Sequence, residues 1–257
     1  MNTLSNTLST PTAGPRIALV TGASRGIGAA IARRLATDGA RLVLHYGSGK
    51  AETESLAAEL RDAGTKVDVV QADLALPDGG QQLVAAVRGL GLPRIDILVN
   101  NAGVAPYAST ADTDAATFER LLNVNVRSLF FVTQGVLPMI PEGGRIIHVS
   151  SAVTRTAFPG IPAYAATKGF VDVLTLQQAA EFGPRGITVN AVAPGAIDTR
   201  MSAWIHGEGG EATLAQIQAL KGIGQPEQVA GVVAFLAGPD GAWTTGQVVD
   251  VSGGTKL

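Results

Sequence analysis

Residues 17–28, IALVTGASRGIG, place an apolar run of four directly before a turn with glycines at 22, 26 and 28. From residue 26 to 38, apolar side chains recur at three- and four-residue intervals, which predicts a helix. Glycines let the backbone turn tightly and approach a pyrophosphate, and the free N–H groups of a following helix favour negative charge. The stretch therefore predicts a strand, a phosphate-binding turn and a helix.

Two other readings of this turn remain to be weighed. The glycine spacing differs from G-x-G-x-x-G, and the Gly-Lys-Ser/Thr of a Walker loop is absent, so ATP or GTP hydrolysis loses support. A tight turn without any ligand is the alternative that this stretch alone leaves open.

The alternation continues along the chain. Further β-branched or aliphatic runs predict strands over 41–46, 67–72, 95–100, 145–150, 187–192 and 247–251. Helical periodicity covers 51–63, 78–90, 116–139, 162–182 and 226–237, with Asp78 and Thr113 as expected caps. Near-continuous apolar strands between helices indicate a parallel sheet covered on both faces. We predict an α/β fold: one doubly wound sandwich of about seven parallel strands.

Unusual residues follow the predicted strands on one side only. TGASRGIG, GSGK, ADL, NNAG, SS and APG come after strands one to six in turn. In such sheets ligands bind beyond the carboxyl ends of the strands. We therefore expect the functional site along that edge.

Composition narrows the functional class. The chain has 257 residues, 46% of them hydrophobic and 16% charged, and no linker-like stretch divides it, so we expect one domain over 16–257. The formal net charge is −2, so the chain lacks the overall positive charge that favours binding to nucleic acid or to an anionic membrane. Its apolar runs are too short to span a bilayer. There are no cysteines, and three widely separated histidines do not suggest a metal site. We expect a soluble cytoplasmic protein with a flexible N-terminal tail at 1–15.

Four motifs together carry a family resemblance. TGASRGIG, NNAG at 100–103, YAATK at 164–168 and APG at 193–195, in this order and spacing, resemble the short-chain dehydrogenase/reductase family over residues 16–257. The 3-oxoacyl-carrier-protein reductase branch and related NADPH ketoreductases are the most similar, also in the closing TTGQVVDVSGG. The resemblance implies a Rossmann fold, a nicotinamide cofactor and a homotetramer built on the helices 116–139 and 162–182.

The resemblance also assigns cofactor contacts. They fall on Gly22, Ser24, Arg25, Gly26, Ile27, Gly28, Tyr46, Ser48, Asp73, Leu74, Asn101, Ala102, Gly103, Tyr164, Lys168, Pro194, Gly195, Ile197 and Thr199. Asp73 is expected beside the adenine, although it could instead only cap the turn toward the next helix.

Charge decides which nicotinamide is expected. A carboxylate about twenty residues past the glycine turn would hydrogen-bond the ribose 2′-hydroxyl and repel a 2′-phosphate. Here strand two ends in HYGSGK and the first acid is Glu52, whereas Arg25 lies within the turn and Ser48 and Lys50 follow the strand. We predict NADP(H) over NAD(H); the alternative is that Arg25 and Lys50 are solvated loop charges.

Tyr164 and Lys168 stand four apart in a predicted helix, so both polar ends face the same space. A phenol, which titrates near ~10, is a poor acid at neutral pH. A fixed ammonium, helped by the positive nicotinamide of an oxidised cofactor, is expected to lower the pKa; a shift of ~3 units needs ~4 kcal/mol. An isolated Y-x-x-x-K would be an ordinary helix pair, but the family context reverses that reading.

The remaining catalytic assignments follow the family pattern. Tyr164 is expected to give a proton to a carbonyl oxygen as hydride reaches the carbon, with Ser151, thirteen residues earlier, hydrogen-bonding the same oxygen. Ser151 is preferred over Ser150, which should face the other way on an extended strand. Asn125, preferred over Asn123, is expected to hold a water that links Lys168 to solvent. Ser151 could instead be a strand-end cap, and Asn125 a partner for buried backbone.

The substrate side is the least regular part of the chain. Residues 196–224, interrupted by glycines at 207, 209 and 210, are expected to form a mobile cover. We expect an apolar pocket lined by Val153, Phe158, Met201 and Trp204, and a small carbonyl or alcohol as substrate. An NAD-linked alcohol or sugar dehydrogenase and a dinucleotide-binding sensor without turnover are the alternative functions.

Overall fold

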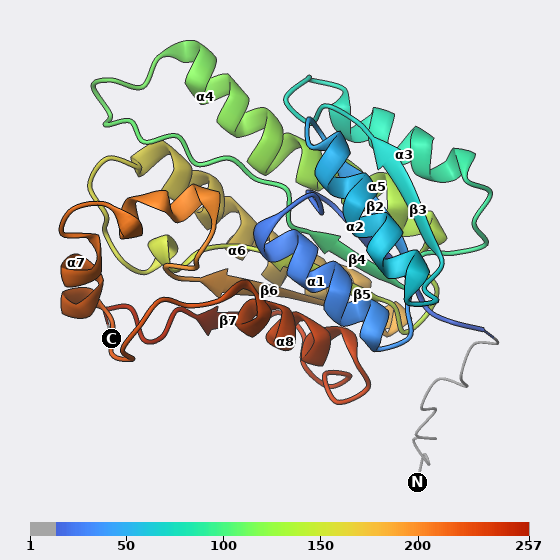
Figure 1. Ribbon diagram of the computed structural model, residues 1–257. Helices are drawn as coiled ribbons and strands as arrows, with labels where there is room; N and C mark the ends of the chain where they lie inside the picture. The colour runs from blue at the N-terminus through green and yellow to red at the C-terminus, as the bar shows by residue number, and fades with distance from the viewer. Residues whose placement is uncertain (1–13, 257) are drawn as a thin grey trace, which may run out of the picture.

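The computed structural model describes residues 14–256 (Figure 1). The expected tail, 1–15, lies outside the described residues except for Gly14 and Pro15. Along residues 14–256, no helix has both the length and the apolarity required to cross a membrane.

Seven strands form one parallel sheet in the order β3-β2-β1-β4-β5-β6-β7. They are β1 (Ile17–Val20), β2 (Arg41–Tyr46), β3 (Val67–Gln71), β4 (Ile97–Asn100), β5 (Arg145–Val149), β6 (Thr188–Pro194) and β7 (Val248–Val251). From β1 the chain adds β2 and β3 on one side of the sheet and then β4 to β7 on the other side. The strand order therefore reverses between β1 and β4, and ligands bind at such a switch point. The predicted doubly wound fold is confirmed.

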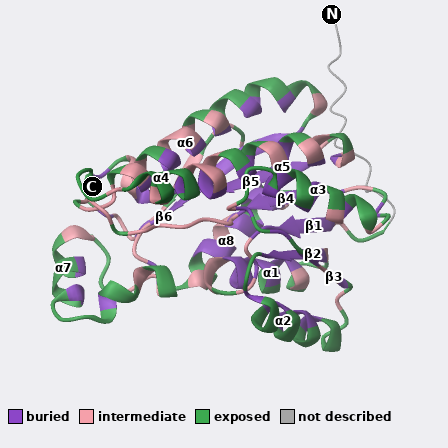
Figure 2. Cartoon of the chain, turned by 90° about the horizontal axis from the view of Figure 1, so that it is seen from above, coloured by how far each residue is buried: buried purple, intermediate pink, exposed green. Residues whose placement is uncertain are grey.

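Helices cover both faces of the sheet (Figures 1 and 2). On one face lie α1 (Gly26–Thr37), α2 (Lys50–Asp62) and α8 (Pro226–Ala237); on the other lie α3 (Gly79–Gly89), α5 (Ser128–Val136) and α6 (Pro162–Phe182). Side chains of β1 alternate between the two layers, Ala18 and Val20 in the first core, Ile17 and Leu19 in the second. Both cores are apolar. The polar residues that follow the strands therefore lie outside the cores, at the carboxyl ends of the strands.

The helix predicted over 116–139 is present as one continuous helical stretch, but it is not α-helical throughout. The structure has α4 (Ala115–Leu121), a π-helical turn (Leu122–Arg127), α5 and a 3-10 turn (Leu137–Met139). Asn125 lies within the π-helical turn and its side chain bonds the backbone of Val104, a long-range contact that periodicity does not reveal. Such turns insert one residue into a helix and are frequent at functional sites.

One of the two expected caps is wrong and the other is in place without its bond. Asp114, not Thr113, caps α4, because its Oδ1 accepts from Thr117 N at 2.7 Å. Thr113 instead donates to Ser109 O. Asp78 stands at the cap position of α3 but makes no side-chain cap hydrogen bond.

Candidate active site

A cleft of about 920 Å³ runs along the carboxyl ends of the strands. The glycine turn, the ends of β2 and β3, the segment after β4, the end of β5, α6 and the segment after β6 line it. All of the expected cofactor contacts except Tyr46 lie on this cleft.

The glycine turn requires its glycines. Gly22 and Gly26 have φ of 65° and 53°, a region that side-chain-bearing residues rarely adopt. A Cβ on Gly28 would lie 2.2 Å from Gly22 O. The first N–H groups of α1 have no side-chain cap, and no acid stands in its first turn. This cradle fits the negative charge of a pyrophosphate.

Two side chains hold the turn in place. Asn101 Nδ2 donates to Thr21 O at 2.9 Å and to Gly22 O at 3.0 Å. His45 Nδ1 accepts from Gly22 N at 3.2 Å, and its Nε2 donates to Ala72 O at 3.1 Å. Burial lowers the pKa of His45 to about 4, so the imidazole is neutral at neutral pH.

Sequence reasoning missed His45 and chose its neighbour Tyr46 instead. Successive strand residues point to opposite faces, so only one of the two can reach the cleft, and it is His45. The available signal was a polar residue interrupting the apolar run RLVLHY of β2.

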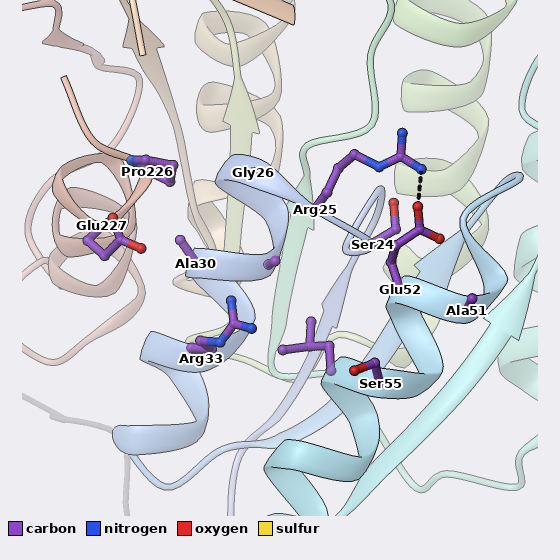
Figure 3. A pocket seen from close by; sticks show the side chains of 12 residues that line it. Ser24, Arg25, Gly26, Ala30, Arg33, Ala51, Glu52, Ser55, Pro226 and Glu227 are labelled. Carbon is purple, nitrogen blue, oxygen red and sulfur yellow. Dashed lines mark hydrogen bonds and ion pairs between the residues drawn. The ribbon is translucent and has the colours of Figure 1, made fainter. Parts of the chain in front are cut away.

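Arg25 lies at the outer edge of the cleft. Its Nη2 is 3.1 Å from Glu52 Oε1 on α2, and both side chains are about half exposed. Arg25 also lines a second hollow of about 580 Å³ between α1, α2 and the start of α8 (Figure 3). Ser48 and Gly49 line the cleft beside Arg25, whereas Lys50 does not.

Asp73 caps the turn after β3 and also lines the cleft, while its place beside the adenine stays a prediction. It lines the cleft, and its Oδ1 accepts from Ala75 N at 2.9 Å, as a residue that caps the turn after β3 does.

Tyr164 and Lys168 lie on one face of α6 at the inner end of the cleft. Lys168 Nζ donates to Val149 O at 2.7 Å and lies 5.8 Å from the centroid of the Tyr164 ring. The Ser151 side chain accepts from Val153 N at 3.4 Å, and it lies close enough to the phenol of Tyr164 to lower the pKa of that group. Ser150 is turned away, with its Oγ donating to Asp172 Oδ1 at 2.5 Å. The three expected residues Ser151, Tyr164 and Lys168 therefore meet.

Burial dominates the electrostatics of this group. Burial raises the pKa of Tyr164, and the nearby Ser151 hydroxyl opposes this rise in part. Burial lowers the pKa of Lys168 to about 8. The nearby carboxylate of Asp172 acts in the other direction and raises this pKa. In the protein alone the phenol is thus less acidic than a free one, opposite in direction to the lowering expected for the complex with an oxidised cofactor.

Asn125 is buried behind this group and does not line the cleft. Its Oδ1 accepts from Val104 N at 2.9 Å, and its Nδ2 donates to Val104 O at 2.9 Å and Thr167 Oγ1 at 3.0 Å. A Cβ on Gly103 would lie 3.5 Å from Asn125 Oδ1 and 3.7 Å from Lys168 Nζ. The side chain therefore partners backbone, the alternative raised from the sequence, while lying near Lys168.

The expected substrate pocket is only partly present. Met201 lines the cleft, but Val153, Phe158 and Trp204 do not. Phe158 is instead covered by Lys256, whose Nζ lies 4.8 Å from the ring centroid and donates to Ala157 O. The cleft is also lined by residues that the sequence did not single out, among them Ala105, Pro106, Arg200 and Ser202.

Comparison with known proteins identifies the family. A family model described as enoyl-(acyl carrier protein) reductase matches residues 22–256. The chain belongs to the short-chain dehydrogenase/reductase family. Among curated relatives, an uncharacterised oxidoreductase of Methylorubrum extorquens is 42% identical over 244 residues, covering 94% of this chain and 98% of that one. Versicolorin reductase 1 of Aspergillus parasiticus is 37% identical over 254 residues, covering 93% and 95%.

Solved structures of this family have the same fold. The angucycline C-6 ketoreductase LanV with bound NADP is 40% identical, with a TM-score of 0.89 over 94% of this chain and 96% of that one. A blue fluorescent protein from a metagenomic library, in complex with NADPH, is 41% identical with a TM-score of 0.88, covering 94% and 98%.

Proposed function

We propose that this short-chain dehydrogenase/reductase is an NADPH-dependent enzyme that reduces a ketone or 3-oxoacyl carbonyl, reversibly, with Tyr164 as general acid and base. The observation that carries the proposal is one cleft with the glycine turn and Arg25 at its outer end and Ser151, Tyr164 and Lys168 at its inner end. The NADP- and NADPH-bound relatives support the cofactor.

The residues of the cleft fit a dinucleotide with a 2′-phosphate. The uncapped start of α1 and the glycine cradle suit the pyrophosphate. Beyond β2 the cleft is lined by Gly47, Ser48 and Gly49, none of them acidic, and Arg25 supplies a guanidinium for the phosphate. When bound, the cofactor supplies the hydride.

The chain's own residues supply the proton. Tyr164 donates the proton of its hydroxyl to the carbonyl oxygen, which the Ser151 hydroxyl orients by a hydrogen bond. Lys168 favours the phenolate that remains, because an ammonium stabilises a nearby anion in a buried site. Since burial alone raises the pKa of Tyr164, this stabilisation depends on the charge of the oxidised cofactor together with Lys168. Asn125 is proposed to hold a water near Lys168 for proton return.

Specific features weigh against the alternatives. An NAD-linked alcohol or sugar dehydrogenase would be favoured by a carboxylate at the end of β2, where this chain has Gly47 and Ser48. A sensor that only binds dinucleotide has no use for a buried lysine beside a buried phenol.

The proposal is tested by mixing the protein with NADPH or NADH and a panel of ketones and 3-oxoacyl thioesters, following the absorbance of the reduced nicotinamide. Tyr164→Phe should bind NADPH like the wild type, measured by fluorescence titration, and lose turnover by roughly 10²–10⁴-fold. Tyr107→Phe is the matched control, because Tyr107 is exposed and does not line the cleft. Turnover retained by Tyr164→Phe would refute the acid assignment.

We also propose that 196–224 covers the substrate. The segment holds a 3-10 stretch (Arg200–His206) and α7 (Gly210–Ile217), separated by Gly209 at φ 73°. Its two ends are tied together by Gly224 N to Ala196 O and Asp198 N to Gly224 O. Such a segment can move as a unit between fixed ends. Faster proteolysis of this segment without cofactor and substrate than with both would support the cover.

A homotetramer is proposed from the apolar side chains that α5 and α6 leave exposed. Phe130, Val173 and Leu176 are large and solvent-exposed in the single chain. Light scattering should give four chains, and Val173→Glu should yield smaller species; a monomeric wild type would contradict the assembly.

A further inference from the structure

Three consecutive residues at the end of β5 each lie beside one residue of α6. Val149 O accepts from Lys168 Nζ, the Ser151 hydroxyl lies close enough to the Tyr164 phenol to lower its pKa, and Ser150 Oγ donates to Asp172 Oδ1 at 2.5 Å. Tyr164, Lys168 and Asp172 are spaced four apart, so they share one face of the helix. The third pair, Ser150 with Asp172, has no part in the proposed reaction so far.

Asp172 differs from the other titratable groups around Lys168 in its charge. Tyr164 and Asp172 lie on the same helix as Lys168, and His148 faces it from β5. Burial lowers the pKa of His148 to about 4 and raises that of Tyr164, so both are neutral near pH 7. Of these three groups, the carboxylate of Asp172 alone opposes the cost of burying the Lys168 ammonium.

Asp172 pairs with Ser150 and not with Lys168. The carboxylate is turned to the Ser150 hydroxyl, the ammonium is turned to Val149 O, and no ion pair joins the two side chains within the described structure. A carboxylate one helical turn away stabilises the ammonium through space and leaves Nζ directed at the cleft.

We propose that Asp172, held by Ser150, is a positioning residue that keeps Lys168 an ammonium directed into the cleft. This inference rests on the proposed function, because there the charge of Lys168 stabilises the Tyr164 phenolate during proton transfer.

The test is a direct titration of Lys168 in the full-length protein without cofactor. The chain has five lysines, so ¹³Cε-lysine NMR spectra are simple and Lys168→Arg assigns the signal. Asp172→Asn keeps the shape and an acceptor for Ser150 while removing the charge. We expect Lys168, with a pKa of about 8 in the wild type, to titrate about 1 pH unit lower, an about tenfold change in its acid dissociation constant.

Two further variants separate charge from shape. Ser150→Ala keeps the carboxylate but releases it toward water, because Asp172 is half-buried, and should lower the pKa of Lys168 by less than Asp172→Asn does. Glu181→Gln, exposed on the same helix, removes an equal charge and should leave the Lys168 titration unchanged.

Turnover gives the second measurement. With NADPH and a ketone, the alkaline limb of the pH profile of kcat should move down in Asp172→Asn by the shift seen in the titration, and Asp172→Glu should restore part of it. A purely structural role would lower kcat equally at every pH.

A Lys168 titration that stays at its wild-type position in Asp172→Asn, or that Glu181→Gln moves equally, overturns the proposal. Should Asp172→Asn not fold, Ser150→Ala decides by the same titration. A shifted titration in a protein that reduces no carbonyl supports the coupling and refutes the proposed function instead.

Discussion

Asn125 and Val104 are joined by two hydrogen bonds, from Val104 N to Asn125 Oδ1 and from Asn125 Nδ2 to Val104 O, both 2.9 Å long. The amide thus pairs with the backbone of the segment after β4 as a neighbouring strand would. Because Asn125 lies in the π-helical turn, this contact ties the turn to the segment that lines the inner cleft.

Asn125→Asp should destabilise the protein by about 2–4 kcal/mol, since a carboxylate cannot donate to Val104 O or Thr167 and is buried. Asn123→Ala is the comparison, because Asn123 makes one hydrogen bond, to Ala75 O, and is half-buried; about 1 kcal/mol is expected. Urea unfolding measures both. Equal losses would show that the two asparagines hold the helix alike.

Glu52→Gln should strengthen NADPH binding about two- to fivefold, because the Glu52 carboxylate no longer competes with the 2′-phosphate for Arg25. This range is the one expected for the loss of an exposed ion pair. NADH, which lacks the 2′-phosphate, should bind as before. Glu54→Gln is the charge-matched control on the same helix, where Glu54 lies 4.0 Å from Arg61. An equal gain for NADH in the titration calorimeter would mean that Glu52 acts on any anion.

Gly28→Ala should weaken NADPH binding at least about tenfold and destabilise the protein by about 1–3 kcal/mol, because the new Cβ would lie 2.2 Å from Gly22 O and 2.5 Å from Asn101 Nδ2. Gly89→Ala, on α3 with nothing within 4 Å of its Cβ, should leave both unchanged or add about 0.5–1 kcal/mol of stability. Wild-type cofactor affinity in Gly28→Ala would contradict the cradle.

Stability should fall as the pH drops from about 6.5 to about 4. Burial lowers the pKa of His45 and His148 from 6.5 to about 4, so over this interval the unfolded chain binds protons that the folded one does not. Each histidine then removes up to roughly 3 kcal/mol. Urea midpoints measured across this range check the slope, which His148→Gln should reduce by about half. Stability that rises toward pH 4 would show that these imidazoles are not buried neutral.

Met201→Ala should change the ratio of kcat/KM for bulky over small ketones by about tenfold, because Met201 lines the cleft and its loss removes apolar contact worth ~1–2 kcal/mol. Trp204→Ala should leave that ratio within about twofold, since Trp204 does not line the cleft and is about half exposed. The reverse result would place Trp204 in the substrate pocket when the cover closes.

Much of this protein follows from short-range patterns. The spacing of apolar residues specifies strands and helices, and glycines mark the turn at residues 22–28, because each feature depends on backbone geometry within a few residues. The parallel sheet and its functional edge follow from the order of the elements. The proximity of Tyr164 and Lys168 follows from helix geometry alone.

Contacts between distant segments decided the rest. Whether His45 or Tyr46 faces the cleft depends on which side of β2 the neighbouring layers cover. Asn125, in the π-helical turn, bonds the backbone of Val104, twenty-one residues away, and Phe158 is covered by Lys256, ninety-eight residues away. Ser150 reaches Asp172 only once β5 packs on α6. Each of these needs three-dimensional packing, which brings together groups that no local pattern relates.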